Sequence, residues 1–162
     1  MKNIKLFFWV IFIQVFILNN IQLSGYINPY YYIVFILFFS SKYSKSTTLL
    51  SSFLIGFIID IFCNSYGAHA FASVLIAYLK ILWVNKLNYG KESEELFEIK
   101  YLSMNRFIII CVYFITIHHF TLFFLESFSF NELFSVLQTT LMSTIFTLIL
   151  LIIHKTLSVS KI

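Results

Sequence analysis

Six apolar segments separated by short polar breaks constrain this chain more strongly than any other feature of its sequence. Hydrophobic residues make up 60% of the 162 positions and charged residues only 11%, with a mean hydropathy of +0.90. An ordinary soluble domain is about 45–50% apolar and about 25% charged. The sequence therefore predicts one all-α integral membrane domain over residues 1–162, a polytopic bundle of about six transmembrane helices. The expected spans are residues 6–18, 30–39, 46–63, 68–84, 107–125 and 133–153.

The basic residues predict how this bundle is oriented. With six spans, all eleven Lys and Arg residues fall on one side or at its membrane boundary, and the three loops on the other side contain none. Positive charge in short loops marks the cytoplasmic side, so both termini are expected to be cytoplasmic. Lys80, inside the fourth span, is expected to extend its ammonium group toward that side. The net charge of +4 does not predict nucleic-acid binding, because no basic run is dense enough to follow a phosphate backbone.

The first two spans carry further local signals. Lys2 and Lys5 before an apolar run resemble a secretory signal, but no small-x-small cleavage site follows, so a retained first span is expected. Pro29 is suited to the first turn of a helix and is expected to open the second span. The tyrosines at residues 30–32 are expected to anchor that span at the membrane surface. This span is short against the about 20 residues that a perpendicular helix needs.

The segment from Gly56 to His69 holds the only Asp of the chain and two of its four glycines. Gly56 and Asp60 are four residues apart and therefore share one face of a helix. We expect Gly56 to let a neighbouring backbone approach. We expect Asp60 to accept hydrogen bonds from the free N–H groups that open the next helix after Gly67, with the ring of His69 as a further donor. A direct contact between Asp60 and a partner or ligand is the alternative, because ionisable groups at membrane depth are often functional.

Counting residues argues against most catalytic classes. A di-aspartyl intramembrane protease needs two carboxylates on facing helices, and the chain has a single Asp. A rhomboid-like hydrolase needs a serine nucleophile beside a histidine base, and no glycine-flanked serine marks one. An enzyme of lipid or polyprenyl metabolism would need clustered charged residues and histidines at the inner face, where Asp is missing. The sequence therefore predicts a protein that is not an enzyme, with no catalytic residue.

Metal, haem and ion-path chemistry are not expected either. His118 and His119 fall in the outer half of the fifth span, whereas His154 falls at the inner end of the sixth, so their depths do not match for a haem pair. Cys63 and Cys111 form no CxxC motif and no metal-ligand spacing. The inner halves of the last two spans are almost unbroken apolar residues, which a polar pathway would not tolerate. No metal and no cofactor are expected.

The same residues carry a resemblance to a known family. Pro29 precedes the second span, Gly-Phe-Ile-Ile-Asp occupies residues 56–60, Ser-Tyr-Gly-Ala-His-Ala residues 65–70, and Ala-Tyr-Leu residues 77–79. In this pattern the chain resembles MreD, the rod shape-determining membrane protein of bacteria. It departs from the family at Tyr66, where many relatives have proline or leucine. The part that carries these motifs runs from residue 29 to about residue 80, and the remainder agrees in hydropathy alone.

The resemblance implies a non-enzymatic component of the machinery that elongates the bacterial cell wall. It implies a multi-pass protein of the bacterial cytoplasmic (inner) membrane, embedded in the lipid bilayer and without a nucleic-acid partner. The partners that it implies are an MreC-like protein, an MreB-like filament, a RodA-type glycosyltransferase and its penicillin-binding transpeptidase. The family motif would comprise Pro29, Gly56, Asp60, Gly67 and His69.

The family is also similar in fold to the S-components of energy-coupling-factor vitamin transporters, which implies an alternative function. In that case the chain would be the small-molecule binding subunit of a membrane transporter. Such a subunit should line an outward cavity with several polar groups and tryptophan. Trp9 and Trp83 are both expected toward the inner side, and the outer loops are short and plain. The scaffold function is therefore the preferred hypothesis.

Overall fold

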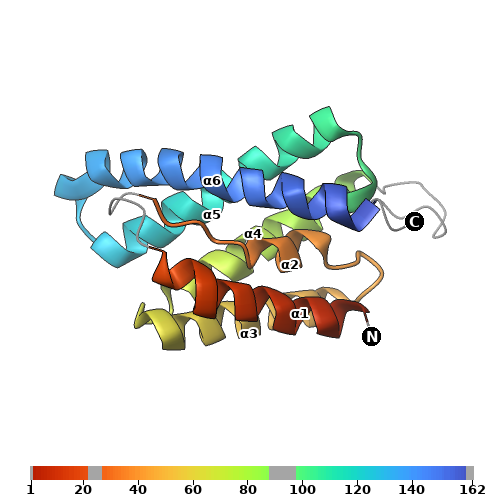
Figure 1. The fold of residues 1–162 in the computed structure, drawn as a ribbon, viewed down its shortest axis with the longest axis horizontal. Coiled ribbons are helices and arrows are strands. Elements are labelled where there is room, and N and C mark those ends of the chain that lie inside the picture. The colour runs from red at the N-terminus through yellow and green to blue at the C-terminus, as the bar shows by residue number, and fades with distance from the viewer. Residues whose placement is uncertain (1, 22–26, 88–97, 160–162) are drawn as a thin grey trace.

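The structure is a computed structural model that describes residues 2–21, 27–87 and 98–159, and its long elements are all α-helices (Figure 1). Helix α1 continues into a π-helical turn, Ile13–Ile17, and a 3-10 turn, Leu18–Asn20. Single 3-10 turns, Ile99–Tyr101 and Phe130–Glu132, precede α5 and α6. The helices are α1 Lys2–Phe12, α2 Ile33–Phe38, α3 Lys45–Cys63, α4 Ala68–Leu87, α5 Met104–Ser127 and α6 Leu133–Val159.

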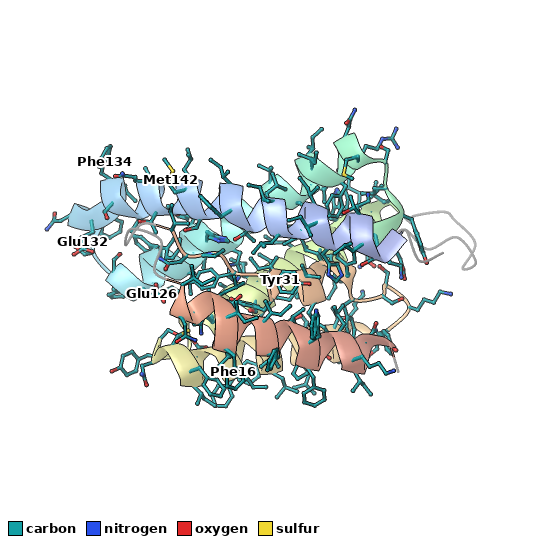
Figure 2. The ribbon with its side chains drawn as sticks, in the orientation of Figure 1. Phe16, Tyr31, Glu126, Glu132, Phe134 and Met142 are labelled. Atoms are coloured by element: carbon teal, nitrogen blue, oxygen red, sulfur yellow. The ribbon has the colours of Figure 1, made fainter. Side chains whose placement is uncertain are left out.

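Five segments of the described chain are long and apolar enough to cross a membrane, where six were expected. Large apolar side chains cover the outside of the molecule: Figure 2 shows Phe16, Phe134 and Met142 pointing away from the bundle. Such a surface suits lipid rather than water, so the chain has the character of a membrane protein. The five segments are Asn3–Asn20, Lys45–Cys63, Ala68–Leu87, Met104–Ser127 and Phe130–Ser158.

The second expected span is not a continuous helix, and this prediction was wrong. Residues 27–32 form no helix, and α2 has only six residues. Pro29 therefore does not open a helix. The three tyrosines that follow it do not lie at a membrane surface: Tyr30, Tyr31 and Tyr32 are 8%, 7% and 0% exposed. Figure 1 shows this segment passing through the middle of the molecule, with α1 on one side and α6 on the other.

Side chains from distant helices satisfy the backbone of this non-helical segment. The N–H of Asn28 donates to Ser143 Oγ at 2.9 Å, and the N–H of Tyr30 donates to Thr147 Oγ1 at 3.0 Å, both on α6. Gln14, buried in the π-helical turn after α1, accepts from the N–H of Tyr31 at 2.7 Å through Oε1. Irregular backbone at membrane depth is tolerated only where protein or water satisfies its polar groups. These hydroxyls and this amide therefore make the segment possible.

The carbonyl end of α2 is capped by Lys80 of α4. Its Nζ donates to the carbonyl oxygens of Ile36 at 2.9 Å and of Phe39 at 2.6 Å. The side chain of Lys80 is buried, so the expectation that it extends to the membrane boundary was wrong. Instead, its donor satisfies helix-end carbonyls that otherwise lack a partner.

The four long helices after residue 45 pack in chain order, α3 against α4, α4 against α5, and α5 against α6. Both chain ends lie at the same end of the molecule (Figure 1). At that end Glu98 accepts a hydrogen bond from Ser40 Oγ at 2.5 Å and pairs with Lys100. Lys155 of α6 donates to the carbonyl of Leu102. Residues 98–102, which precede α5, are thereby held by Ser40 before α3 and by Lys155 of α6.

Candidate functional site

The joint between α3 and α4 is built around a close approach at Gly56. A Cβ added to Gly56 would lie 2.6 Å from the Cα of Ala70 and 2.6 Å from the carbonyl oxygen of His69. Both are backbone atoms of α4, which cannot move aside as a side chain could. Only glycine lets the two helices come this close, as the sequence predicted.

Asp60, one turn after Gly56, caps the start of α4. Its Oδ1 accepts from the N–H of His69 at 2.9 Å and from Ser65 Oγ at 2.6 Å, and its Oδ2 accepts from the N–H of Ala70 at 2.8 Å. The carboxylate thus satisfies two of the orphan N–H groups of the helix, at the end where its dipole favours negative charge. The contact expected between Asp60 and the start of the next helix is present.

The turn between the two helices uses three residues with positive φ. Asn64 ends α3 at φ 54°, Tyr66 follows at 52° and Gly67 at 95°. Asn and Gly adopt this region readily, whereas Tyr does so at a cost. A proline could not take the φ of Tyr66, so this turn requires a residue other than proline at position 66.

The ring of His69 does not reach Asp60, contrary to expectation. Its Nδ1 lies 2.8 Å from the hydroxyl of Tyr32, and that hydroxyl lies 2.7 Å from Nε2 of His118 on α5. The other ring nitrogen of His69, Nε2, lies 3.9 Å from Oε1 of Glu126 at the end of α5. We call Glu126, His69, Tyr32 and His118 the Glu–His–Tyr–His chain. It ties α4, α5 and the segment before α2 together.

The direction of the hydrogen bonds in this chain follows from counting protons. Tyr32 has one hydroxyl proton, so it donates to one ring and accepts from the other. His69 Nε2 and His118 Nδ1 both lack a hydrogen-bond partner among the described residues, so either direction leaves one buried N–H unpaired. That N–H is less unfavourable at His69 Nε2, because this nitrogen lies 3.9 Å from the Glu126 carboxylate. We therefore assign the proton of His118 to Nε2, which donates to Tyr32. Tyr32 then donates to His69 Nδ1, and the N–H of His69 is Nε2, facing Glu126.

Tyr30 and His119 form a second buried group beside this chain. The Tyr30 ring packs 4.8 Å from the His69 ring and 5.4 Å from the His119 ring, between centroids. His119 Nδ1 donates to the carbonyl of Ile115 at 2.9 Å, and its Nε2 lies 3.2 Å from Thr147 Oγ1. Thr147 therefore links His119 to the backbone of Tyr30. These contacts order the centre of the bundle.

Four of the five motif residues come together, and Pro29 stands slightly apart. Gly56, Asp60, Gly67 and His69 form the α3–α4 joint, while the carbonyl of Pro29 accepts from Gln14 Nε2 at 3.2 Å. Tyr30, the residue after Pro29, reaches the joint through its contact with His69.

The burial of the three tyrosines at residues 30–32, and the polar residues that hold this segment, were not predicted from the sequence. A signal was present: Gln14 is the one polar interruption of the first apolar run, and Ser143 and Thr147 lie four apart on one face of α6. Polar residues inside apolar spans usually face the bundle interior. Their partners, however, lie far away in the sequence.

Two cavities open at the end of the bundle that carries the joint. One, of about 470 Å³, is lined by Gln14, Asn19, Asn28, Pro29 and Cys63 among others. The other, of about 490 Å³, lies between the α3–α4 turn and the end of α5. In the part of the chain that the structure describes, no three His, Cys, Asp or Glu side chains are grouped to hold a metal ion.

No protein family, curated protein or solved structure matches the chain.

Proposed function

We propose that this chain is a non-enzymatic membrane component of the machinery that elongates the bacterial cell wall, as its resemblance to MreD implies. The observation that carries the proposal is the α3–α4 joint. Gly56, Asp60, Gly67 and His69, on which the resemblance rests, are the residues that determine how closely and at what register the two helices meet. A motif used in this way defines a rigid shape for other proteins to bind.

The proposal includes six membrane crossings, with both termini in the cytoplasm. Five crossings are the long apolar segments, and the second is the non-helical segment together with α2, enclosed by the other helices. The position of both chain ends at one end of the bundle (Figure 1) and the restriction of Lys and Arg to that side support this arrangement.

The partners in this proposal are those that the resemblance implies. An MreC-like protein and a RodA-type glycosyltransferase with its penicillin-binding transpeptidase would bind within or outside the bilayer, and an MreB-like filament at the cytoplasmic end. Exposed apolar helix faces such as those of α1 and α6 offer surface for helix packing in the membrane.

Depletion of the protein tests the function. Rod-shaped cells should become round, and purification of the tagged protein from membranes should recover MreC-like and RodA-like proteins. Rods of normal shape after depletion would contradict the proposal. In a matched strain that carries the Asp60→Leu variant, protein level is measured alongside cell shape, and a lower level should accompany rounder cells.

The alternative is the small-molecule binding subunit of a transporter, and the cavity of about 470 Å³ favours it. Gln14, Asn19 and Asn28 give this cavity polar walls, although neither tryptophan lines it. Its volume lies within the about 300–1,000 Å³ typical of ligand pockets. Under this alternative, depletion would leave rod shape intact and impair the uptake of one vitamin, measured with radiolabelled compounds.

A further inference from the structure

The second cavity, of about 490 Å³, lies where three helix ends meet. Asn64, Ser65 and Tyr66 of the α3–α4 turn form one wall, and Leu125 and Glu126 of α5 form another. Figure 2 places Glu126 at the end of the bundle opposite the two chain termini, the same end as Glu132. We call this cavity the Glu126 pocket.

The local charge in the Glu126 pocket is uncompensated. Glu126 occupies the last turn of α5, and α3 also ends at the pocket, so two helix C-termini add partial negative charge. A carboxylate at this position is unfavourable on its own, because helix C-termini favour cations. The sequence holds no Lys or Arg between residues 46 and 79 or between residues 107 and 154, so no basic side chain of α3, the turn or the outer parts of α4, α5 and α6 can neutralise it.

His69 does not neutralise Glu126 either. Its Nε2 is fully buried and has no hydrogen-bond partner among the described residues, and the 3.9 Å to Glu126 Oε1 exceeds hydrogen-bond length. Its other nitrogen is engaged by Tyr32. The N–H of the His69 ring therefore makes no hydrogen bond. The Glu126 carboxylate lies between this buried ring and the pocket, which it lines.

The N–H groups at the start of α4, the third helix end at the pocket, are not free to bind an anion. The N–H groups of His69 and Ala70 are held by Asp60, and the N–H of Ala68 donates to the carbonyl of Ser65 at 3.0 Å. A lipid headgroup that presents a phosphate beside its ammonium would therefore bring an uncompensated negative charge. Tyr66, fully exposed at the rim, offers the face of an aromatic ring, which attracts cations.

We propose that the Glu126 pocket binds the ammonium or guanidinium group of a Lys or Arg side chain from the outer segment of a partner protein. Glu126 is the counter-ion, and the Tyr66 ring and the α3 and α5 carbonyl ends complete the site. This inference deepens the scaffold proposal and rests on it, because it names the kind of side chain through which a partner would dock at the outer face.

Cys63 supplies a reporter inside the pocket. It lines both cavities, including the Glu126 pocket, and is exposed, whereas Cys111, the other cysteine, is buried. The full-length protein, with Cys111→Ala, is placed in phosphatidylcholine nanodiscs. The modification rate of Cys63 is measured with a cationic and an anionic methanethiosulfonate of similar size, and the ratio of the two rates is compared with that of a free thiol. Because any change in thiol acidity alters both rates together, the ratio reports the local potential.

We expect the cationic reagent to be favoured by about threefold or more, as a single nearby carboxylate would produce at low salt. Glu126→Gln should abolish this preference, and Glu132→Gln, which removes a carboxylate at this end that does not line the pocket, should leave it unchanged. A ratio equal to that of the free thiol, or one insensitive to Glu126→Gln, would overturn the proposal. Thermal unfolding of each variant confirms that it is folded.

The second measurement identifies the ligand. N-acetyl-lysine amide and N-acetyl-arginine amide should protect Cys63 from modification, N-acetyl-norleucine amide should not, and Glu126→Gln should remove the protection. Protection by none of them refutes a basic side chain as the ligand. Protection in nanodiscs that contain phosphatidylethanolamine, without protection by the amino-acid amides, assigns the site to lipid and overturns the partner proposal. Neither measurement depends on cell shape, so failure here is distinguishable from failure of the scaffold function.

Discussion

At the scale of single residues, substitution of Asp60 should remove several buried hydrogen bonds at once. Asp60 accepts three hydrogen bonds at 2.6–2.9 Å and is 5% exposed. Asp60→Leu would leave two buried N–H groups of α4 without acceptors. Each unsatisfied N–H group costs about 1–3 kcal/mol. We expect a loss of about 3 kcal/mol in the free energy of unfolding and a lower protein level in membranes.

Thermal unfolding in detergent, together with quantitative immunoblotting, checks this expectation. Ile61→Leu, at the exposed neighbouring position, serves as the control and should behave like wild type. Normal stability and abundance of Asp60→Leu would mean that the cap does not hold the joint together.

Gly56 can be tested by the smallest possible change. Gly56→Ala adds one carbon where backbone atoms of α4 lie 2.6 Å away, and such overpacking costs about 1–3 kcal/mol. In a helix where space is free, the same change would stabilise by about 1 kcal/mol. The sign of the change in unfolding free energy therefore decides: destabilisation supports the close approach, stabilisation refutes it. Ser51→Ala on the same helix is the matched control.

At the scale of elements, α2 depends on a side chain from α4. Lys80→Met would leave the carbonyls of Ile36 and Phe39 without their donor in the bundle interior. We therefore expect the free energy of unfolding to fall by about 2 kcal/mol. Lys86→Met, an exposed lysine at the end of the same helix, should have little effect. Equal thermal stability of the two variants would show that α2 does not need its cap.

The loop before α5 should respond to pH through Glu98. Burial alone would raise the pKa of Glu98, but hydrogen bonds from Lys100 and Ser40 outweigh it and lower the pKa below 4.5. A lowered folded-state pKa contributes stability above the unfolded value, and this contribution is lost as pH falls below about 4.5. Because the pair is near the surface, the contribution is at most about 1 kcal/mol.

Comparison of wild type with Glu98→Gln checks this pH dependence. Wild type should be the more stable at pH 7, and the difference in melting temperature should shrink as the pH falls to 3. A difference that is the same at both pH values would exclude Glu98 as its source. Glu132→Gln controls for the general effect of removing a carboxylate.

How much could be read from the sequence depended on how far apart the interacting residues are. Helices α3 to α6 were predicted closely because each is a long apolar run with polar residues at its ends. The contact from Asp60 to His69 and Ala70 spans nine and ten residues and follows from a helix–turn–helix pattern.

The second span failed because its partners are remote. Tyr30 pairs with Thr147 across 117 residues, and Tyr32 with His118 across 86. No periodicity along the chain reports such contacts, so the local apolar run suggested a helix where residues 27–32 are not helical. The Glu–His–Tyr–His chain was missed for the same reason.

At the scale of the whole molecule, the arrangement of the termini makes a direct prediction. In a background with Cys63→Ser and Cys111→Ala, Asn64→Cys should react with a membrane-impermeant maleimide in intact spheroplasts. Tyr101→Cys, at an exposed position at the other end, should react only after permeabilisation. Labelling of both positions in intact spheroplasts, or the opposite pattern, would overturn the orientation with both termini inside.

The non-helical segment before α2 also constrains how the protein can be made. Its N–H groups at Asn28 and Tyr30 bond to Ser143 and Thr147, which leave the ribosome more than a hundred residues later. In lipid, unpaired N–H groups cost several kcal/mol each. The segment therefore cannot pack between the other helices when it is synthesised. We expect it to remain in the insertion machinery or at the membrane surface until α6 is present. Maturation ends only when the last helix arrives, so a chain truncated before α6 should be recognised as unfinished and degraded.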